Sequence, residues 1–233
     1  MKQLVAPFVA ATLAFGGLAS DARAAATYLF PNTPYLSFAD SPFSGGSFGA
    51  FHLETFEDHL LNSPGVSASA GGVTSVVFGP SIHDSVDADD GAIDGSGLQG
   101  DSYFGSGPTG FTFTFDAATL GVLPTSAGVV WTDAGGGASV TFSAFGLGGN
   151  LLFTHTESGF VDNSNNGETA EDRFFGVVNA AGISAIFISN SSGGIEVDHL
   201  QYGGAAAVPE PQTYALMLAG LAAGFVVARR RRG

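Results

Sequence analysis

The sequence predicts an all-β protein with the architecture of a β-sandwich, and three observations support this prediction. Short apolar runs recur at a spacing of roughly 8–12 residues, separated by clusters of Gly, Asn, Ser and Asp that favour turns. The segment 110–115 alternates strictly, so that Phe111, Phe113 and Phe115 share one face of a strand. Long stretches with the 3.6-residue period of an amphipathic helix are absent from the sequence. We therefore expect one domain of packed sheets.

The N-terminus predicts a secretory signal peptide over residues 1–24. Lys2 supplies the positive charge, residues 4–18 form an apolar stretch, and Ala22-Arg23-Ala24 fits the small-residue cleavage site. The general secretion machinery and signal peptidase are therefore expected partners. Residues 25–50 follow as a segment rich in Pro, Gly and Ser, for which we expect irregular structure.

The β-sandwich is expected over residues 51–204. Its candidate strands, beside 110–115, are 128–132, 138–145, 150–155, 173–178, 183–189 and 195–202. Trp131 is the only tryptophan and lies in an apolar run, so we expect it in the core. The alternative is an exposed indole that would serve as a stacking platform for sugar rings.

The C-terminus divides into a short linker at 205–207 and a three-part segment at 208–233. Two prolines flank one glutamate and keep that stretch extended and non-helical. The uncharged run 213–228 predicts a single transmembrane helix of roughly 24 Å, a little shorter than the ~30 Å hydrocarbon core. Arginines at its far end can reach the headgroups and hold that end in the cytoplasm. The residues assigned to this signal are Val208, Pro209, Glu210, Pro211, Arg229, Arg230, Arg231 and Arg232.

This order of a Pro-Glu-Pro motif, an apolar span and an arginine cluster resembles the PEP-CTERM sorting signal of exported bacterial proteins. The resemblance implies that an exosortase, a membrane transpeptidase, is the processing partner. It also implies transient anchoring in the inner membrane by the C-terminal helix, followed by delivery to the cell surface or extracellular matrix. The resemblance is confined to the tail, so the role of the exported body must be argued from its own residues.

The exported body is strongly acidic. Between residues 25 and 207, Arg173 is the one Lys or Arg and stands against 19 Asp and Glu, which makes the charge −18. This charge excludes nucleic acid as a partner, because phosphates would be repelled. Bound cations would offset the repulsion, and Ca²⁺ is the expected cofactor because it prefers oxygen ligands. The chain has no cysteine, so disulfides contribute nothing to its stability.

An acidic loop around Gly91 provides the first candidate metal site. Its five carboxylates within eleven residues would converge on Ca²⁺, or else form a solvated acidic loop. The loop resembles an EF-hand loop, but glycine falls fifth from Asp87 instead of sixth, and no Glu stands at the twelfth place. The residues assigned to this site are Asp84, Asp87, Asp89, Asp90 and Asp94. A second loop, 162–167, fits half of an EF-hand, but Arg173 at its twelfth place favours an exposed turn.

A second candidate site pairs an early acid, Glu57, with a late one, Asp198. Their positions near the first and in the last expected strand are similar to those in jelly-roll carbohydrate-binding modules. The resemblance implies a jelly-roll-like sandwich in which Glu57 and Asp198 share a structural Ca²⁺ ion. The alternative is that both are ordinary exposed acids.

Catalytic signals are weak. Residues 45–49 satisfy G-x-S-x-G, but a Pro/Ser/Gly loop precedes them where a nucleophile elbow needs a strand. No catalytic residue is therefore assigned. We predict a non-catalytic surface or matrix protein that binds or structures extracellular polysaccharide. The alternatives are an exported glycosidase or lyase, and an ice- or surface-binding protein, for which a flat array of regularly spaced Thr is expected.

Overall fold

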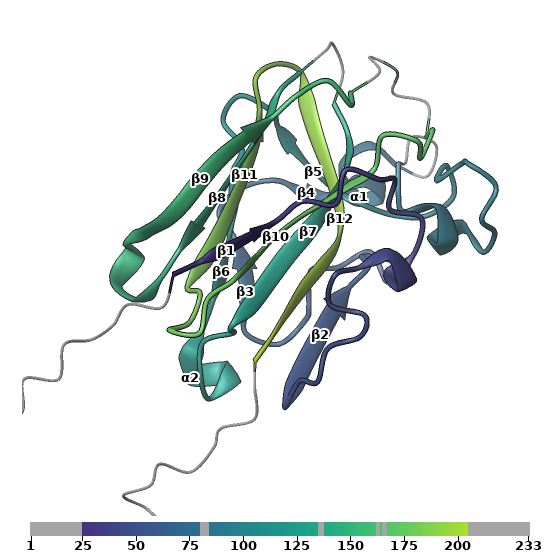
Figure 1. The fold of residues 1–233 in the computed structure, drawn as a ribbon. Helices are drawn as coiled ribbons and strands as arrows, with labels where there is room; N and C mark the ends of the chain where they lie inside the picture. The colour runs from purple at the N-terminus through teal and green to yellow at the C-terminus, as the bar shows by residue number, and fades with distance from the viewer. Residues whose placement is uncertain (1–24, 80–83, 135–137, 162–163, 165–166, 205–233) are drawn as a thin grey trace, which may run out of the picture.

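The computed structural model describes residues 25–79, 84–134, 138–161, 164 and 167–204. The predicted signal peptide, linker, sorting signal and transmembrane helix, with most of the 162–167 turn, lie outside these residues. Within them, 12 strands form two antiparallel sheets, which confirms the all-β prediction (Figure 1). The few helices in this described part are too short to cross a bilayer.

The first sheet has the strand order β1-β10-β7-β12-β5-β4, and β2 also pairs with β12. Its strands are β1 (Thr27–Leu29), β10 (Arg173–Val178), β7 (Ser126–Asp133), β12 (Gly194–Gly204), β5 (Tyr103–Ser106), β4 (Gly72–Val73) and β2 (Ala50–Glu54). The second sheet contains, in order, β3 (Val66–Ala68), β6 (Phe111–Phe115), β11 (Ala185–Asn190), β8 (Val140–Phe145) and β9 (Leu151–Glu157). Short helices α1 (Thr74–Phe78) and α2 (Ala117–Leu120) and 3₁₀ turns at Phe38–Asp40, Asp87–Asp90 and Leu147–Gly149 complete the described elements.

The connections give the sandwich the topology of a jelly roll. From β5 to β12 the chain passes repeatedly between the sheets, so that β5-β12-β7-β10 lie in one sheet and β6-β11-β8-β9 in the other. These are the two four-stranded sheets of an eight-stranded jelly roll. The jelly-roll-like prediction is therefore confirmed, and β1, β2, β3 and β4 extend the two sheets at their edges.

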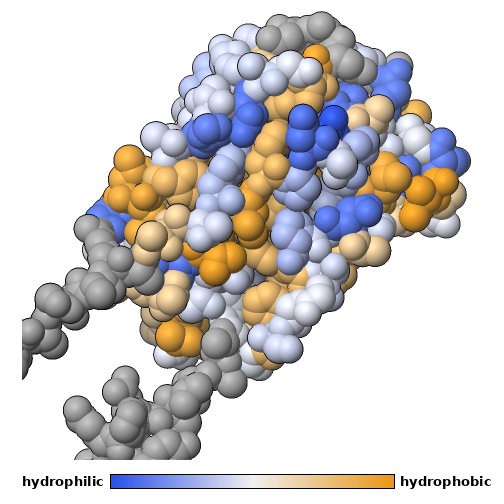
Figure 2. Space-filling model, viewed as in Figure 1, coloured by the Kyte–Doolittle hydropathy of each residue, from blue (hydrophilic) through white to orange (hydrophobic). Residues whose placement is uncertain are grey.

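The core lies between the sheets and follows the alternation of the strands. Phe111, Phe113 and Phe115 are buried, as expected, while Thr112 and Thr114 between them face outward. Trp131 is fully buried in the core, and its indole N–H donates to Asn190 Oδ1 at 2.9 Å. The core prediction for this tryptophan is therefore confirmed. On the face seen in Figure 2, polar and apolar residues alternate in narrow bands.

The segment before residue 51 covers the outer face of the first sheet. Strand β1 pairs with β10, and the chain then crosses the sheet, burying Tyr35 and Phe43 against Val130 and Phe174. Odd-numbered neighbours such as Val129 face the main core, so even-numbered Val130 needs this second cover. The N-terminal segment thus forms a small second core of its own on the sheet.

The register of the first sheet separates two ends of the molecule. Thr27 is opposite Val178, Val178 opposite Ser126, and Ser126 opposite Gly203, so both ends of the described body lie at one end of the sandwich (Figure 1). Asp133 is opposite Glu196 at the other end. Gly204, the last described residue before the sorting segment, therefore lies at the end of the sandwich opposite to these acids.

Candidate functional site

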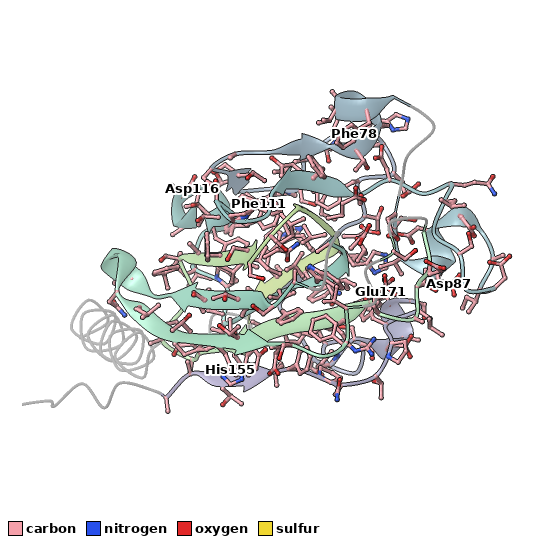
Figure 3. All side chains as sticks on the ribbon, turned by 90° about the horizontal axis from the view of Figure 1, so that it is seen from above. Phe78, Asp87, Phe111, Asp116, His155 and Glu171 are labelled. Carbon is pink, nitrogen blue, oxygen red and sulfur yellow. The ribbon has the colours of Figure 1, made fainter. Side chains whose placement is uncertain are left out.

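Five buried carboxylates gather at the end of the first sheet that is remote from Gly204. One lies at the end of β7, one in β12, two immediately before β10, and one in the loop that leads to the Asp87–Asp90 turn. Each is at most 9% exposed. In the view of Figure 3, Glu171 and Asp87 both lie toward this end of the molecule. We call this group the acidic cluster, and its members are Asp84, Asp133, Glu171, Asp172 and Glu196.

The acids of the cluster raise one another's pKa values. Burial, followed by repulsion from Glu196, Asp133 and Glu171, raises the pKa of Asp84 to about 10. Burial and then Asp133 raise the pKa of Glu196 to about 8. The pKa of Asp172 is also raised, first by burial and then by Asp84. Asp84 therefore lies within electrostatic reach of every other member.

The side-chain carboxylates of two members of the cluster have no hydrogen-bond partner among the described residues. Both carboxylate oxygens of Asp84 and both of Asp172 are buried without a donor. The hydroxyls of Thr132 and Thr169 are also buried without a hydrogen-bond partner among the described residues. Trp131 pairs with Arg173, so continuing that register by one residue sets Thr132 opposite Asp172. Buried polar groups are almost always hydrogen-bonded, so four partnerless carboxylate oxygens are unusual in a folded domain.

The nearby positive charge is that of Arg173, and its guanidinium is directed to backbone oxygens. It donates to the carbonyls of Ala170 and Asp172, each at 2.9 Å, and lies 5.6 Å from the ring centre of Phe160. Burial lowers its pKa, while Asp172 and Glu171 act in the opposite direction. One guanidinium against five carboxylates leaves a strong excess of potential negative charge.

Among the residues assigned to the acidic loop, Asp84 alone belongs to the acidic cluster. Asp87 is buried, but its carboxylate accepts the backbone N–H groups of Asp94, Gly95 and Ser96 at 3.0–3.2 Å and so folds its own loop. Asp90 accepts the N–H of Ala92 at 2.9 Å, and Asp94 is exposed. The carboxylates of this loop thus point in different directions.

Asp89 and Asp198 belong to a hydrogen-bonded network with His199. Within the described residues, these three offer ligand atoms that lie within 4.8 Å of one another. His199 Nε2 contacts Asp89 Oδ2 at 2.8 Å, and Asp198 accepts the N–H groups of Val86 at 2.9 Å and of His199 at 2.5 Å. Since these atoms already have partners, the network fastens the acidic loop onto β12. His199 adopts a φ of 43°, which is uncommon for a residue other than glycine, and the hydrogen bonds of this network stabilise that conformation.

Glu57 lies in a separate polar cavity of about 320 Å³, together with His59, Ser75 and Asp101. Its Oε1 accepts the N–H of Asp101 at 2.6 Å. Desolvation is the main cause that raises the pKa of Glu57 to about 7, although the residue retains exposed surface. Burial alone would raise the pKa of Asp101, but hydrogen bonds from His59, Ser75 and Thr74 outweigh it and lower the value to about 2.

The residues Ser75, His59 and Asp101 lack the geometry of a catalytic triad. A triad uses one imidazole nitrogen for the nucleophile and the other for the acid. Here His59 Nδ1 contacts both Asp101 Oδ2, at 2.8 Å, and Ser75 Oγ, at 3.0 Å. Asp101 also accepts the Ser75 hydroxyl and, at 3.0 Å, the Ser75 N–H, so it anchors the start of α1. A larger cavity of about 580 Å³ is lined by His52, Thr119, Tyr202 and apolar residues, without a carboxylate.

The outward face of the second sheet carries rows of hydroxyl groups. Residues directly opposite one another on paired strands share a face. One row runs Thr112, Phe187, Ser143 and Thr154 across β6, β11, β8 and β9. We call this surface the hydroxyl face, and its polar members are Ser67, Thr112, Thr114, Thr141, Ser143, Thr154, Thr156 and Ser189.

Two half-exposed aromatic rings, Phe187 and Phe145, lie among these hydroxyls. Gly110 makes room for Phe187, because a Cβ at that glycine would lie 2.7 Å from the Phe187 ring. The hydroxyls of Ser143 and Thr154 are 2.7 Å apart, and those of Thr141 and Thr156 are 2.9 Å apart. These cross-strand hydrogen bonds hold the hydroxyl groups in regular positions.

Comparison with known families decides how the chain is sorted. The family model of the PEP-CTERM protein-sorting motif matches residues 207–232. The chain carries a PEP-CTERM sorting signal. The PEP-CTERM motif implies that the protein is exported, is anchored at the membrane during processing, and has an exosortase as its processing partner. No curated protein and no solved structure matches the chain.

Sequence reasoning about this PEP-CTERM protein missed most of the acidic cluster. Asp133, the adjacent pair Glu171 and Asp172, and Glu196 are far apart in the sequence and belong to no ligand-spacing motif. The available signal was the position of Asp133 at the end of β7 and of Glu171 and Asp172 immediately before β10. The G-x-S-x-G match at 45–49 lies in a turn that leads into β2, without the helix that a nucleophile elbow requires.

Proposed function

We propose that this PEP-CTERM protein is a non-catalytic component of the cell surface or extracellular matrix that binds or structures polysaccharide through a calcium-stabilised sandwich. The observation that supports binding is the hydroxyl face with Phe187 at its centre. Sugar rings have apolar C–H faces that stack on aromatic rings, and hydroxyl rims that hydrogen-bond to side chains such as Thr and Ser. A flat row of this kind suits an extended polymer better than a small molecule.

The orientation of the molecule is compatible with this role. Both ends of the described body lie at one end of the sandwich, so the hydroxyl face runs along its side and remains accessible during anchoring. A body charge of −18 would repel an anionic polymer. We therefore expect neutral polysaccharides to be preferred, or anionic ones in the presence of a divalent cation.

The test is the affinity of the full chain, purified in detergent with calcium, for the matrix polysaccharide of its host and for a glycan array. Replacing Phe187→Ala should weaken binding about tenfold, which corresponds to ~1.4 kcal/mol. The matched control is Phe78→Ala, because Phe78 is 44% exposed on α1 and lies outside the hydroxyl face. Equal affinity of the Phe187 variant and the wild type would refute the assignment of this face.

The regular Thr spacing also favours a second candidate, an ice- or surface-binding protein. The rows repeat at the strand separation of ~4.8 Å, and alternate residues along a strand repeat at ~6.8 Å. Ice binding predicts thermal hysteresis that disappears when Thr154 and Thr156 are both replaced by Lys, while polysaccharide binding predicts none. Polysaccharide turnover that is lost in Glu57→Gln would instead support the enzyme alternative.

A further inference from the structure

We propose that the acidic cluster is a calcium site, with Asp84 and Asp172 as its central ligands and Asp133, Glu171 and Glu196 as further carboxylates. This inference rests on the proposed stabilisation of the sandwich by calcium, and it names the ligands. It moves the site away from the exposed part of the acidic loop and from the pair Glu57 and Asp198. The ion would tie together the ends of β7, β10 and β12 and the chain that enters the acidic loop.

The first argument is that the buried carboxylates of Asp84 and Asp172 lack hydrogen-bond donors. Asp172 is completely buried and Asp84 is 4% exposed, and the carboxylate oxygens of both lack donors among the described residues. Each is also within electrostatic reach of the other. By contrast, the equally buried Asp87 and Asp198 are satisfied by backbone N–H groups. The fold therefore satisfies some of its buried acids internally and leaves these two for a ligand.

The second argument is the chemistry of the donors. The cluster offers carboxylates and the nearby hydroxyls of Thr132 and Thr169, without histidine or cysteine. Such all-oxygen sets suit hard cations, and a high number of carboxylates favours Ca²⁺, which takes 6–8 oxygens, over Mg²⁺, which keeps several waters. The charge also fits, because two positive charges would join Arg173 in offsetting five carboxylates.

The third argument concerns how the ligands would close around the ion. Among the described residues, no three of these carboxylates bring one oxygen each within 4.8 Å of one another. Ca²⁺ with ligand distances of 2.3–2.6 Å would draw them together by side-chain rotation. Glu171 and Asp172 precede β10 in a connecting segment, where the backbone is less constrained than in a strand. The central ligands therefore come from loops, and Asp133 and Glu196 come from strands.

The rival explanation is that the acids stay neutral by holding protons. Replacing Asp84→Asn or Asp172→Asn separates the two explanations, because an amide keeps the shape and removes the charge. Under the calcium proposal, either variant should lose the stabilisation by calcium and should melt at or above the wild type in EDTA, since repulsion is relieved. The matched controls are Asp90→Asn and Asp94→Asn, which remove the same charge from the exposed part of the acidic loop.

The experiment is a thermal melt of the full chain in detergent, in EDTA, calcium, magnesium or sodium chloride at matched ionic strength. Calcium at a hundredfold excess over Kd should raise the wild-type midpoint by ~5–10 °C beyond salt alone. The control variants should keep this shift, and the Asp84 and Asp172 variants should lose it. A shift that both Asn variants retain, or that the loop controls lose, would overturn the ligand assignment while leaving calcium stabilisation intact. A wild-type shift equal to that in salt would overturn both.

Terbium luminescence locates the ion independently of stability. Trp131 is the only tryptophan, and it lies two residues from Asp133 and opposite Arg173, next to Asp172. Terbium binds calcium sites, so it should show emission sensitised by Trp131 that calcium displaces. This emission should disappear in Asp84→Asn and Asp172→Asn and persist in Asp90→Asn. If the Asn variants fail to fold, absence of calcium-displaceable emission from the folded wild type overturns the proposal.

Discussion

Replacing Tyr35→Phe should destabilise the protein by removing one hydroxyl that joins the N-terminal segment to β12. Gln201 Nε2 donates to the Tyr35 hydroxyl at 2.9 Å, and this hydroxyl contacts His199 Nδ1 at 2.9 Å. Because the hydroxyl accepts from Gln201, it donates to His199, and His199 Nε2–H then donates to Asp89. The phenyl ring would keep the stacking of Tyr35 on Phe174, so the substitution opens no cavity.

The magnitude follows from the groups left behind. Gln201 and His199 are at most 2% exposed, so each would retain a buried polar atom without a partner. At ~1–3 kcal/mol for each such group, the free energy of unfolding should fall by about 3 kcal/mol. For a domain of this size, that lowers the melting midpoint by ~6–12 °C.

Urea denaturation of the full chain in detergent measures this change. The matched control is Tyr28→Phe in the same segment. The Tyr28 hydroxyl donates to Glu157 over a long distance, 3.4 Å, in a half-buried position. The control should lose less than ~1 kcal/mol. Equal urea midpoints for the Tyr35 variant and the wild type, with unchanged slopes, would refute the idea that this network holds the N-terminal segment on the sheet.

Three further predictions concern a buried acid, a close contact and the tail. The pKa of Asp101 is lowered from its ordinary 3.8 to about 2, so its stabilising effect is present above pH ~4 and is lost as the pH falls through ~2. Asp101→Asn should therefore remove ~1–2 kcal/mol at neutral pH and flatten the loss of stability in acid; parallel pH profiles would contradict this. Gly128→Ala should cost ~1–3 kcal/mol, because its Cβ would meet the Phe174 ring at 2.3 Å and the Phe175 carbonyl at 2.8 Å; an unchanged melting midpoint would argue against that packing. Glu210→Ala should leave an unprocessed, membrane-retained form in the host, and normal processing by intact mass would disprove the role of this residue.

Local patterns in the sequence predicted much of the sandwich. The strands from β6 to β12 were predicted from alternation and turn clusters. Alternation is a local property, because successive side chains of a strand point to opposite faces of the sheet. The tail was equally readable, since a sorting signal is a linear motif that can be recognised without the fold of the body. The strands β1 to β5 were not anticipated, because they are short or lie in stretches rich in Gly, Ser and Pro. Pairing with β10, β12 and β6 stabilises most of them, and β4 pairs with β5.

The sequence alone could not predict where the acids lie in the folded protein. Composition showed that the body is acidic, but it could not separate Asp87, which its own loop satisfies, from Asp84, which nothing in the described residues satisfies. The acidic cluster exists because β7 pairs with both β10 and β12, which brings Asp172 and Glu196 to the same end of the sheet. The hydroxyl face likewise forms only because β6, β11, β8 and β9 pair in a register that sets their hydroxyl residues opposite one another. Pairing between strands far apart in the chain depends on packing of the whole core, and only the tertiary structure decides it.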